Sequence, residues 1–312
     1  MHVLISGASG LLGSAIRPAL HAAGHSTSAL VRRVPQVRAP VSVADPGSWS
    51  AVNELQWDPV QPLDWQKLNG VDAIIHLAGK NIFGLWTKQF KRQVRDSRVL
   101  GSGTLSTAAA ESCRRTGMPR TFVAASAIGY YGNRGDELLT EQSPPGSDFL
   151  AHVCEEWEAA TTPAADAGVR VVNLRIGVVL AGQGGALKAM LPAFRLGLGG
   201  PVGTGRQYWS WIALDDLVNI FLFALANDSL HGPANAVAPN PGRNAEFTRT
   251  LAEVLHRPAI FPLPEFVVKI LFGEMGESLL LASARVEPTK LESAGYRFRH
   301  YDFAEALENI LG

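Results

Sequence analysis

The chain has 312 residues, of which 46% are hydrophobic and 18% charged, a composition typical of a folded globular protein and not of a disordered one. Lys and Arg total 28, as do Asp and Glu, and no dense basic run occurs, so we expect no nucleic-acid partner. The two cysteines make neither a disulfide framework nor a metal cluster, and the sequence contains no signal peptide or long apolar span, so we expect a cytoplasmic protein without a membrane segment.

A glycine-spaced turn follows the first apolar run of the chain, residues 3–5. Such a turn suits a dinucleotide: one glycine permits the turn, a second lets backbone approach a pyrophosphate, and a third lets helix pack on strand. The amphipathic stretch 11–23 then offers free amides at a helix N-terminus to the phosphates. An ordinary glycine-rich turn is the alternative, but the flanking strand and helix favour a cofactor site made of Gly7, Ser9, Gly10, Leu11, Leu12 and Gly13.

Strand-like and helix-like segments alternate through the first part of the chain. Short apolar runs predict strands at residues 3–6, 26–31, 73–77, 121–125 and 169–174. Helical periodicity predicts helices at 11–23, 87–115 and 149–167. This alternation is typical of a parallel sheet covered on both faces, so we predict an α/β fold, a Rossmann doubly wound parallel sheet.

After Gly177 the pattern changes, because glycine and proline breaks become frequent. We therefore expect a small, discontinuous C-terminal substrate lobe. The predicted dinucleotide-binding domain covers residues 1–178, and 212–240 return to it. The substrate lobe takes residues 179–211 and 241–312.

The end of the second predicted strand favours NADP over NAD. An acidic residue at this place takes the ribose 2′-hydroxyl of NAD, whereas arginine accommodates the 2′-phosphate of NADP. The chain has Leu30-Val31-Arg32-Arg33 there and no acid, and a guanidinium suits a phosphate. Two solvated arginines are the alternative, but the position favours NADPH binding, with Arg32 ahead of Arg33.

Several motifs occur in the order seen in the extended short-chain dehydrogenases/reductases, and the chain resembles that family. They are the 7–13 turn, His76-Leu77-Ala78-Gly79, Ser126 with Tyr130-Tyr131-Gly132, and Leu174-Arg175-Ile176-Gly177. The resemblance is closer to the atypical epimerase branch, the YfcH-like and SulA-like nucleoside-diphosphate-sugar epimerases. It is carried by Trp57-Asp58-Pro59, Gly79-Lys80-Asn81-Ile82, Ser97-Arg98 and Trp157-Glu158-Ala159-Ala160, and residues 262–307 resemble the C-terminal domain of unknown function of that branch.

The resemblance implies further cofactor contacts and a mode of assembly. Residues after the predicted strand 73–77 would line the cofactor, two polar residues of the long helix would reach it, and backbone after Arg175 would approach the nicotinamide. These residues are Leu77, Ala78, Gly79, Gln93, Arg98, Val178 and Val179. A homodimer through the helices 87–115 and 149–167 is also implied, although packing within one chain would explain the same patterns.

The catalytic pattern of the family is incomplete in this sequence. Most members use a Tyr-x-x-x-Lys pair with a nearby hydroxyl, but the helix at 149–157 has Cys154 at the lysine position and an apolar residue at the tyrosine position. Ser126 is the expected hydroxyl, and Tyr130 or Tyr131 would supply a phenol for proton transfer. A packing role is the alternative for the second tyrosine.

The substrate lobe also departs from the family. Nucleotide-sugar epimerases carry an arginine that binds the diphosphate, and Trp209 occupies its position here. Arg206 or Arg195 would have to compensate. Tyr208 and Trp209, with Trp211, would form an aromatic wall for a planar or apolar ligand, unless they pack inside the lobe.

Three functions are therefore compatible with the sequence. The first is an NADP-dependent oxidoreductase acting on an unknown small molecule. The second is an NADP-sensing or regulatory protein without turnover, a role that fits relatives linked with cell division. The third is a nucleotide-sugar epimerase, which the missing arginine and catalytic pair make the weakest of the three.

Overall fold

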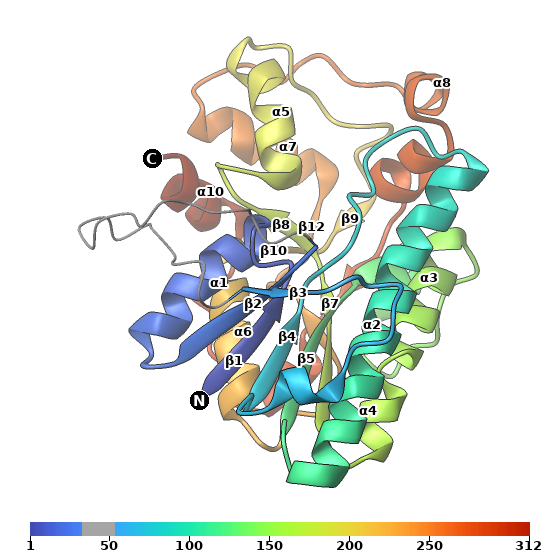
Figure 1. Ribbon diagram of the computed structural model, residues 1–312. Helices are drawn as coiled ribbons and strands as arrows, with labels where there is room; N and C mark the ends of the chain where they lie inside the picture. Colours follow the sequence, from blue (N-terminus) through green and yellow to red (C-terminus); the bar gives the residue numbers. More distant parts are fainter. Residues whose placement is uncertain (33–53) are drawn as a thin grey trace, which may run out of the picture.

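The computed structural model describes residues 1–32 and 54–312, and Figure 1 shows its arrangement. Seven strands form the main sheet in the spatial order β11-β7-β5-β4-β1-β2-β3, and every neighbouring pair is parallel. The order reverses beside β1, which is the arrangement of a Rossmann-type doubly wound sheet and confirms the predicted α/β fold class. The strands are β1 (His2–Ser6), β2 (Ser26–Val31), β3 (Glu54–Gln56), β4 (Ala73–His76), β5 (Thr121–Ala127), β7 (Arg170–Ile176) and β11 (Gly232–Ala236).

Helices cover both faces of this sheet. On one face lie α1 (Leu11–Ala22) and α6 (Leu214–Ala226), and on the other lie α2 (Lys88–Thr116), α3 (Phe149–Ala159) and α4 (Thr162–Asp166) (Figure 1). Each face has its own apolar cluster, because the strands bury side chains on both sides. Three strands, β1, β4 and β5, are almost entirely buried, which explains their unbroken apolar runs.

The single helix predicted at residues 149–167 is wrong, since α3 ends at Ala159 and α4 begins at Thr162. The physical reason is Pro163, which stands in the first turn of α4. Proline has no N–H to donate to the carbonyl of Ala159, so the helix cannot continue through it. Pro18, by contrast, is inside α1 on an exposed position, where the helix stays unbroken.

A second lobe lies beyond the carboxyl ends of the strands (Figure 1). Its core joins side chains from α5, α7 and α10 with the short strands beside them. Its elements are β8 (Val178–Leu180), α5 (Gly185–Arg195), β9 (Tyr208–Trp209), β10 (Trp211–Ala213), β12 (Gly242–Arg243), α7 (Asn244–Val254), α8 (Glu265–Gly276) and α10 (Phe303–Leu311), while β6 (Leu138–Leu139) pairs with β13 (Arg285–Val286) beside it. The short helix α9 (Thr289–Ser293) packs instead on β11 of the main sheet.

The tail of the chain is fixed to the start of α6 by one buried carboxylate. Asp216 accepts hydrogen bonds from the Tyr296 hydroxyl (3.1 Å) and from the backbone of Arg299 and His300.

Within the described ranges, no helix is long and apolar enough to cross a membrane.

Candidate functional site

The glycine turn between β1 and α1 is too tight for side chains. An added Cβ on Gly13 would lie 2.4 Å from the Gly7 carbonyl oxygen, and one on Gly7 would lie 2.8 Å from the Leu77 backbone. Gly7 also has a φ of +75°, which favours glycine. Gly10 precedes α1 without a side-chain cap, so the first amides of α1 remain available to an anion.

The end of β4 closes against this turn. The backbone amides of Leu77 and Ala78 donate to the Ser6 hydroxyl at 3.2 and 3.4 Å. The same hydroxyl lies 2.6 Å from Nδ1 of His76, whose imidazole is fully buried. These hydrogen bonds hold the backbone of Leu77 and Ala78 against the glycine turn.

Loop residues of the second lobe cover the other side of the turn. Leu11 packs against Gly184, where an added Cβ would lie 2.8 Å from the leucine side chain. Ser9 and Gly10 stay exposed, while Leu12 is half-buried and packs on the sheet core. The turn is therefore open toward solvent at the point where a pyrophosphate would approach its backbone.

The predicted polar cofactor residues lie in different environments. Arg32 is exposed at the end of β2, as its proposed contact with a 2′-phosphate requires, whereas Arg33 lies outside the described residues. Gln93 is exposed on α2. Arg98 instead turns inward, and its Nη1 donates to the carbonyl of Lys80 at 3.0 Å.

A buried polar network lies at the end of β5. The Ser126 hydroxyl donates to Glu158 Oε1 (2.7 Å), and Arg175 donates to both carboxylate oxygens of Glu158 at 2.8 Å. Arg175 Nη1 also donates to the Tyr131 hydroxyl (3.0 Å), which donates in turn to Asn235 (2.7 Å). Burial alone would lower the pKa of Arg175, but the hydrogen bonds and charge of Glu158 outweigh burial and raise it.

This network corrects the catalytic prediction for Tyr131. Its side chain is fully buried and its hydroxyl is occupied by Arg175 and Asn235, so it has no free face for a substrate. Burial raises the pKa of Tyr131 to about 12 in spite of the charge of Arg175. Tyr130 differs, because it is only half-buried and its ring lies on the Arg175 guanidinium, 3.4 Å from carbon to ring centroid.

The middle of α3 is apolar where the family has its catalytic pair. Leu150 and Cys154 both pack against Gly129, and Cys154 is buried. Burial, followed by the negative charge of Glu158, raises the pKa of Cys154 to about 12, so the thiol is neutral. His152 and Glu155 are exposed on another side of α3. These side chains therefore do not replace the Tyr-x-x-x-Lys pair of the family.

Part of the backbone after β7 is hydrogen-bonded within the protein. Val178 and Val179 are half-buried in β8, as a nicotinamide contact would require. However, the Val178 amide donates to the Ser210 carbonyl at 2.9 Å. That amide is therefore not a free donor for a ligand.

The predicted aromatic wall is only partly present. Trp209 and Trp211 are buried in the lobe core, where Trp209 lies 5.3 Å from Phe247 between ring centroids. Lobe packing, the alternative to a ligand role, therefore describes both rings. Tyr208 is half-buried between the guanidiniums of Arg243 (4.4 Å) and Arg285 (5.3 Å).

Arg206 is exposed beside this aromatic group. Its backbone carbonyl accepts a hydrogen bond from Arg243 Nη1, while its own side chain makes no ion pair with a described residue. The cationic groups that the structure gathers around Tyr208 are thus Arg243 and Arg285, neither of which the sequence analysis predicted.

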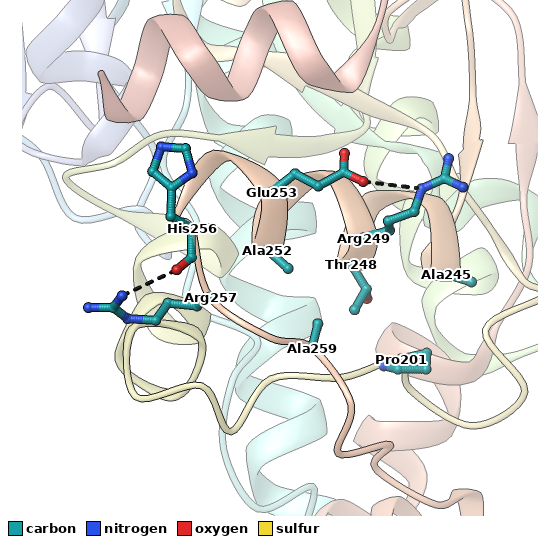
Figure 2. Close-up of a pocket in the computed structure, with 9 residues that line it drawn as sticks. All are labelled: Pro201, Ala245, Thr248, Arg249, Ala252, Glu253, His256, Arg257 and Ala259. Atoms are coloured by element: carbon teal, nitrogen blue, oxygen red, sulfur yellow. Dashed lines mark hydrogen bonds and ion pairs between the residues drawn. The ribbon is translucent and has the colours of Figure 1, made fainter.

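An open hollow of about 750 Å³ lies on the surface of the second lobe. Figure 2 shows residues of α7 on one side of it and Pro201 and Ala259 on the other. Its charged side chains are occupied locally: Arg249 lies 3.9 Å from Glu253, and Arg257 donates to the His256 carbonyl. No predicted site residue lines this hollow, so it is separate from the cofactor turn.

The sequence analysis missed Glu158 as a site residue. Glu158 was noted only as part of a family motif, yet it connects Ser126 to Arg175. A signal was present: Glu158 lies four positions after the buried Cys154, and an acid on the apolar side of a helix requires a partner.

Comparison with known proteins agrees with this geometry. Residues 3–237 match the family model "NAD dependent epimerase/dehydratase family", and residues 263–310 match "Domain of unknown function (DUF1731)". The chain belongs to the NAD-dependent epimerase/dehydratase family, which confirms the resemblance to its atypical epimerase branch with a C-terminal domain of unknown function.

Individual relatives extend the comparison over almost the whole chain. The Epimerase family protein MT2273 of Mycobacterium tuberculosis (strain CDC 1551 / Oshkosh) is 42% identical over 98% of this chain and 96% of its own. The crystal structure of human epimerase family protein SDR39U1 (isoform2) with NADPH is 33% identical, with a TM-score of 0.85 and 99% of both chains covered. A UDP-N-acetylglucosamine 4-epimerase from Bacillus cereus shares the fold alone, at 16% identity, a TM-score of 0.72, and coverage of 99% of this chain and 98% of its own.

Proposed function

We propose that this protein binds NADP(H) and acts as an NADP-dependent oxidoreductase on a small molecule. The observation that carries the proposal is the glycine turn, which packs too closely for Cβ atoms at Gly7 and Gly13 and leads into a helix whose first amides have no side-chain cap. The exposed Arg32 at the end of β2, with no acid beside it, supports NADP over NAD. The presence of NADPH in the human relative supports the same cofactor.

The residues of the site then have distinct tasks. When bound, NADPH supplies a hydride. The amides at the start of α1 bind its pyrophosphate and Arg32 its 2′-phosphate. Ser126 gives its hydrogen to Glu158, so its oxygen accepts a hydrogen bond from a substrate or product hydroxyl, and the half-buried Tyr130 moves the proton.

A second candidate is an NADP-sensing protein without turnover. The specific observation in its favour is α3, where Leu150 and the neutral Cys154 replace the expected proton-transfer pair. A nucleotide-sugar epimerase has less support, because Trp209 is buried where a diphosphate-binding arginine is expected.

Turnover distinguishes these candidates. Purified protein with NADPH and a panel of aldehydes, ketones and quinones is expected to consume the NADPH absorbance. Tyr130→Phe should then slow turnover by about a hundredfold or more, because it removes a general acid. Tyr131→Phe should instead lower the free energy of unfolding, because the Tyr131 hydroxyl is hydrogen-bonded inside the protein. Tight NADPH binding with no turnover across the panel would favour the sensor, and calorimetric binding of a UDP-sugar would favour the epimerase.

A further inference from the structure

Two arginines of the second lobe lie beside one tyrosine ring. The guanidinium carbon of Arg243, on β12, is 4.4 Å from the ring centroid of Tyr208, and that of Arg285, on β13, is 5.3 Å from it. Tyr208 is the partner of Arg243 in the antiparallel pair of β9 and β12. The fold thus brings two cations together from separate segments of the chain.

Hydrogen bonds fix the backbone around this cluster. The Tyr208 amide donates to the Ser283 hydroxyl (2.9 Å), which donates in turn to the Gly135 carbonyl (2.6 Å). The Ser283 amide donates to Asn133 Oδ1 (3.0 Å). Because Arg285 follows Ser283 by two residues, these bonds determine where its guanidinium lies relative to Tyr208.

Arg285 is a half-buried cation without an anionic partner. Within residues 1–32 and 54–312, its guanidinium donates no hydrogen bond and forms no ion pair, and its Nε is buried without an acceptor. Its contact with the Tyr208 ring satisfies none of its five N–H donors. These donors are therefore left to water or to a ligand.

The second cation of the cluster has a weakly held carboxylate. Arg243 Nη2 lies 3.2 Å from Asp136 Oδ2, and its Nη1 donates to the Arg206 carbonyl. The Asp136 side chain is 71% exposed, so water and salt screen this pair. Among the described residues, no other acid forms an ion pair with either guanidinium, so the cluster keeps an excess of positive charge.

Other half-buried arginines are compensated inside the protein. Arg134, in the loop beside the cluster, pairs with Glu137, and Arg170 donates to three backbone carbonyls. Burying a cation without such partners is costly, so the unpaired Arg285 indicates a ligand that supplies oxygens. A phosphate group suits two guanidiniums better than a carboxylate does, because it has more charge and three acceptor oxygens.

We propose that Arg285 and Arg243 form a binding site for the phosphate group of a small ligand on the second lobe. The site is built on β9, β12 and β13 and uses no residue of the glycine turn. The proposal goes beyond the proposed function, because it requires neither NADP(H) nor turnover.

Inorganic pyrophosphate is a probe for this site. In calorimetric titration of the full chain with excess NADPH present, Arg285→Met should raise the Kd for pyrophosphate about tenfold to a hundredfold, the effect of losing charged hydrogen bonds. Arg249→Met is the matched control, because Arg249 is an arginine of the same lobe that lies 3.9 Å from Glu253. It should leave the Kd for pyrophosphate unchanged.

A second variant and a second probe separate binding from folding and from general charge. Arg285→Lys keeps the charge but loses the planar guanidinium, so it should keep the thermal stability and lose part of the pyrophosphate affinity. Malonate, which has two carboxylates, should bind the wild type more weakly than pyrophosphate does.

Three results would overturn the proposal: a wild type that does not bind pyrophosphate, equal Kd values for wild type and Arg285→Met, or an equal loss in Arg249→Met. Tighter binding of malonate would overturn the choice of phosphate. A wild type that binds pyrophosphate through Arg285 but does not bind NADPH would support this site and contradict the proposed function alone.

Discussion

At the scale of single residues, we expect Arg32 to determine which nicotinamide cofactor the site prefers. It is exposed at the end of β2, and within residues 1–32 and 54–312 no ion pair holds it, so its charge is available to a ligand. We expect Arg32→Ala to weaken NADPH binding by about 1.5–3 kcal/mol, the value of a charged hydrogen bond, and to leave NADH binding unchanged. Fluorescence titration with both cofactors measures the ratio of the two affinities.

The control for Arg32 is another exposed arginine far from the glycine turn. Arg92→Ala removes a charge that pairs with Asp96 one turn later on α2, and it should leave the ratio unchanged. If wild type and Arg32→Ala show equal preference for NADPH over NADH, then Arg32 does not select the 2′-phosphate.

At the scale of secondary-structure elements, Glu158 joins α3 to β5 and β7. The side chains of Arg175 and Glu158 are 3% and 12% exposed, and their contact is bidentate. Glu158→Gln leaves a buried guanidinium without its charge partner, which costs about 3–5 kcal/mol in the free energy of unfolding. Urea denaturation measures this loss.

A double variant tests whether the cost comes from the unpaired charge. Glu158→Gln with Arg175→Met removes both charges, so it should be more stable than the sum of the two single changes predicts. A loss below about 1 kcal/mol for Glu158→Gln would contradict a strong pair, because exposed ion pairs contribute that little.

The strands were predictable because burial on both faces leaves a signal within each strand. β2 (Ser26–Val31) coincides with its predicted range, and β1 and β4 differ from theirs by one residue. The break between α3 and α4 was also visible in the sequence, since Pro163 cannot donate to Ala159, but the periodicity continued across it.

The candidate site was less predictable than the fold. The glycine turn is local, so its spacing carries the information. Glu158 and Arg175 meet across α3 and β7, and no local periodicity records that contact. The burial of Trp209 likewise depends on α7 and α10 closing over β9, which the sequence of β9 alone does not show.

At the scale of the whole molecule, stability depends on a histidine in the middle of the sheet. His76 is fully buried at the end of β4, with Nδ1 beside the Ser6 hydroxyl and Nε2 without a partner among the described residues. Burial lowers its pKa to about 4. The folded protein therefore holds this imidazole neutral, while the unfolded chain protonates it near its ordinary pKa of about 6.5.

The sign of the pH dependence follows from proton binding. Between pH values of about 6.5 and 4 the unfolded state binds one more proton at His76 than the folded state, so acid favours unfolding. The contribution of His76 is fully present above about pH 6.5 and falls by about 3 kcal/mol as the pH approaches 4.

A substitution without a titratable group isolates this contribution. His76→Gln is expected to lower stability at every pH, but its stability should fall less steeply than that of the wild type between pH values of about 7 and 4. Urea unfolding at several pH values measures both curves, and the carboxylates cancel in the difference because both proteins share them. Parallel curves would mean that His76 titrates alike in the folded and unfolded states, contrary to its burial between β1 and α2.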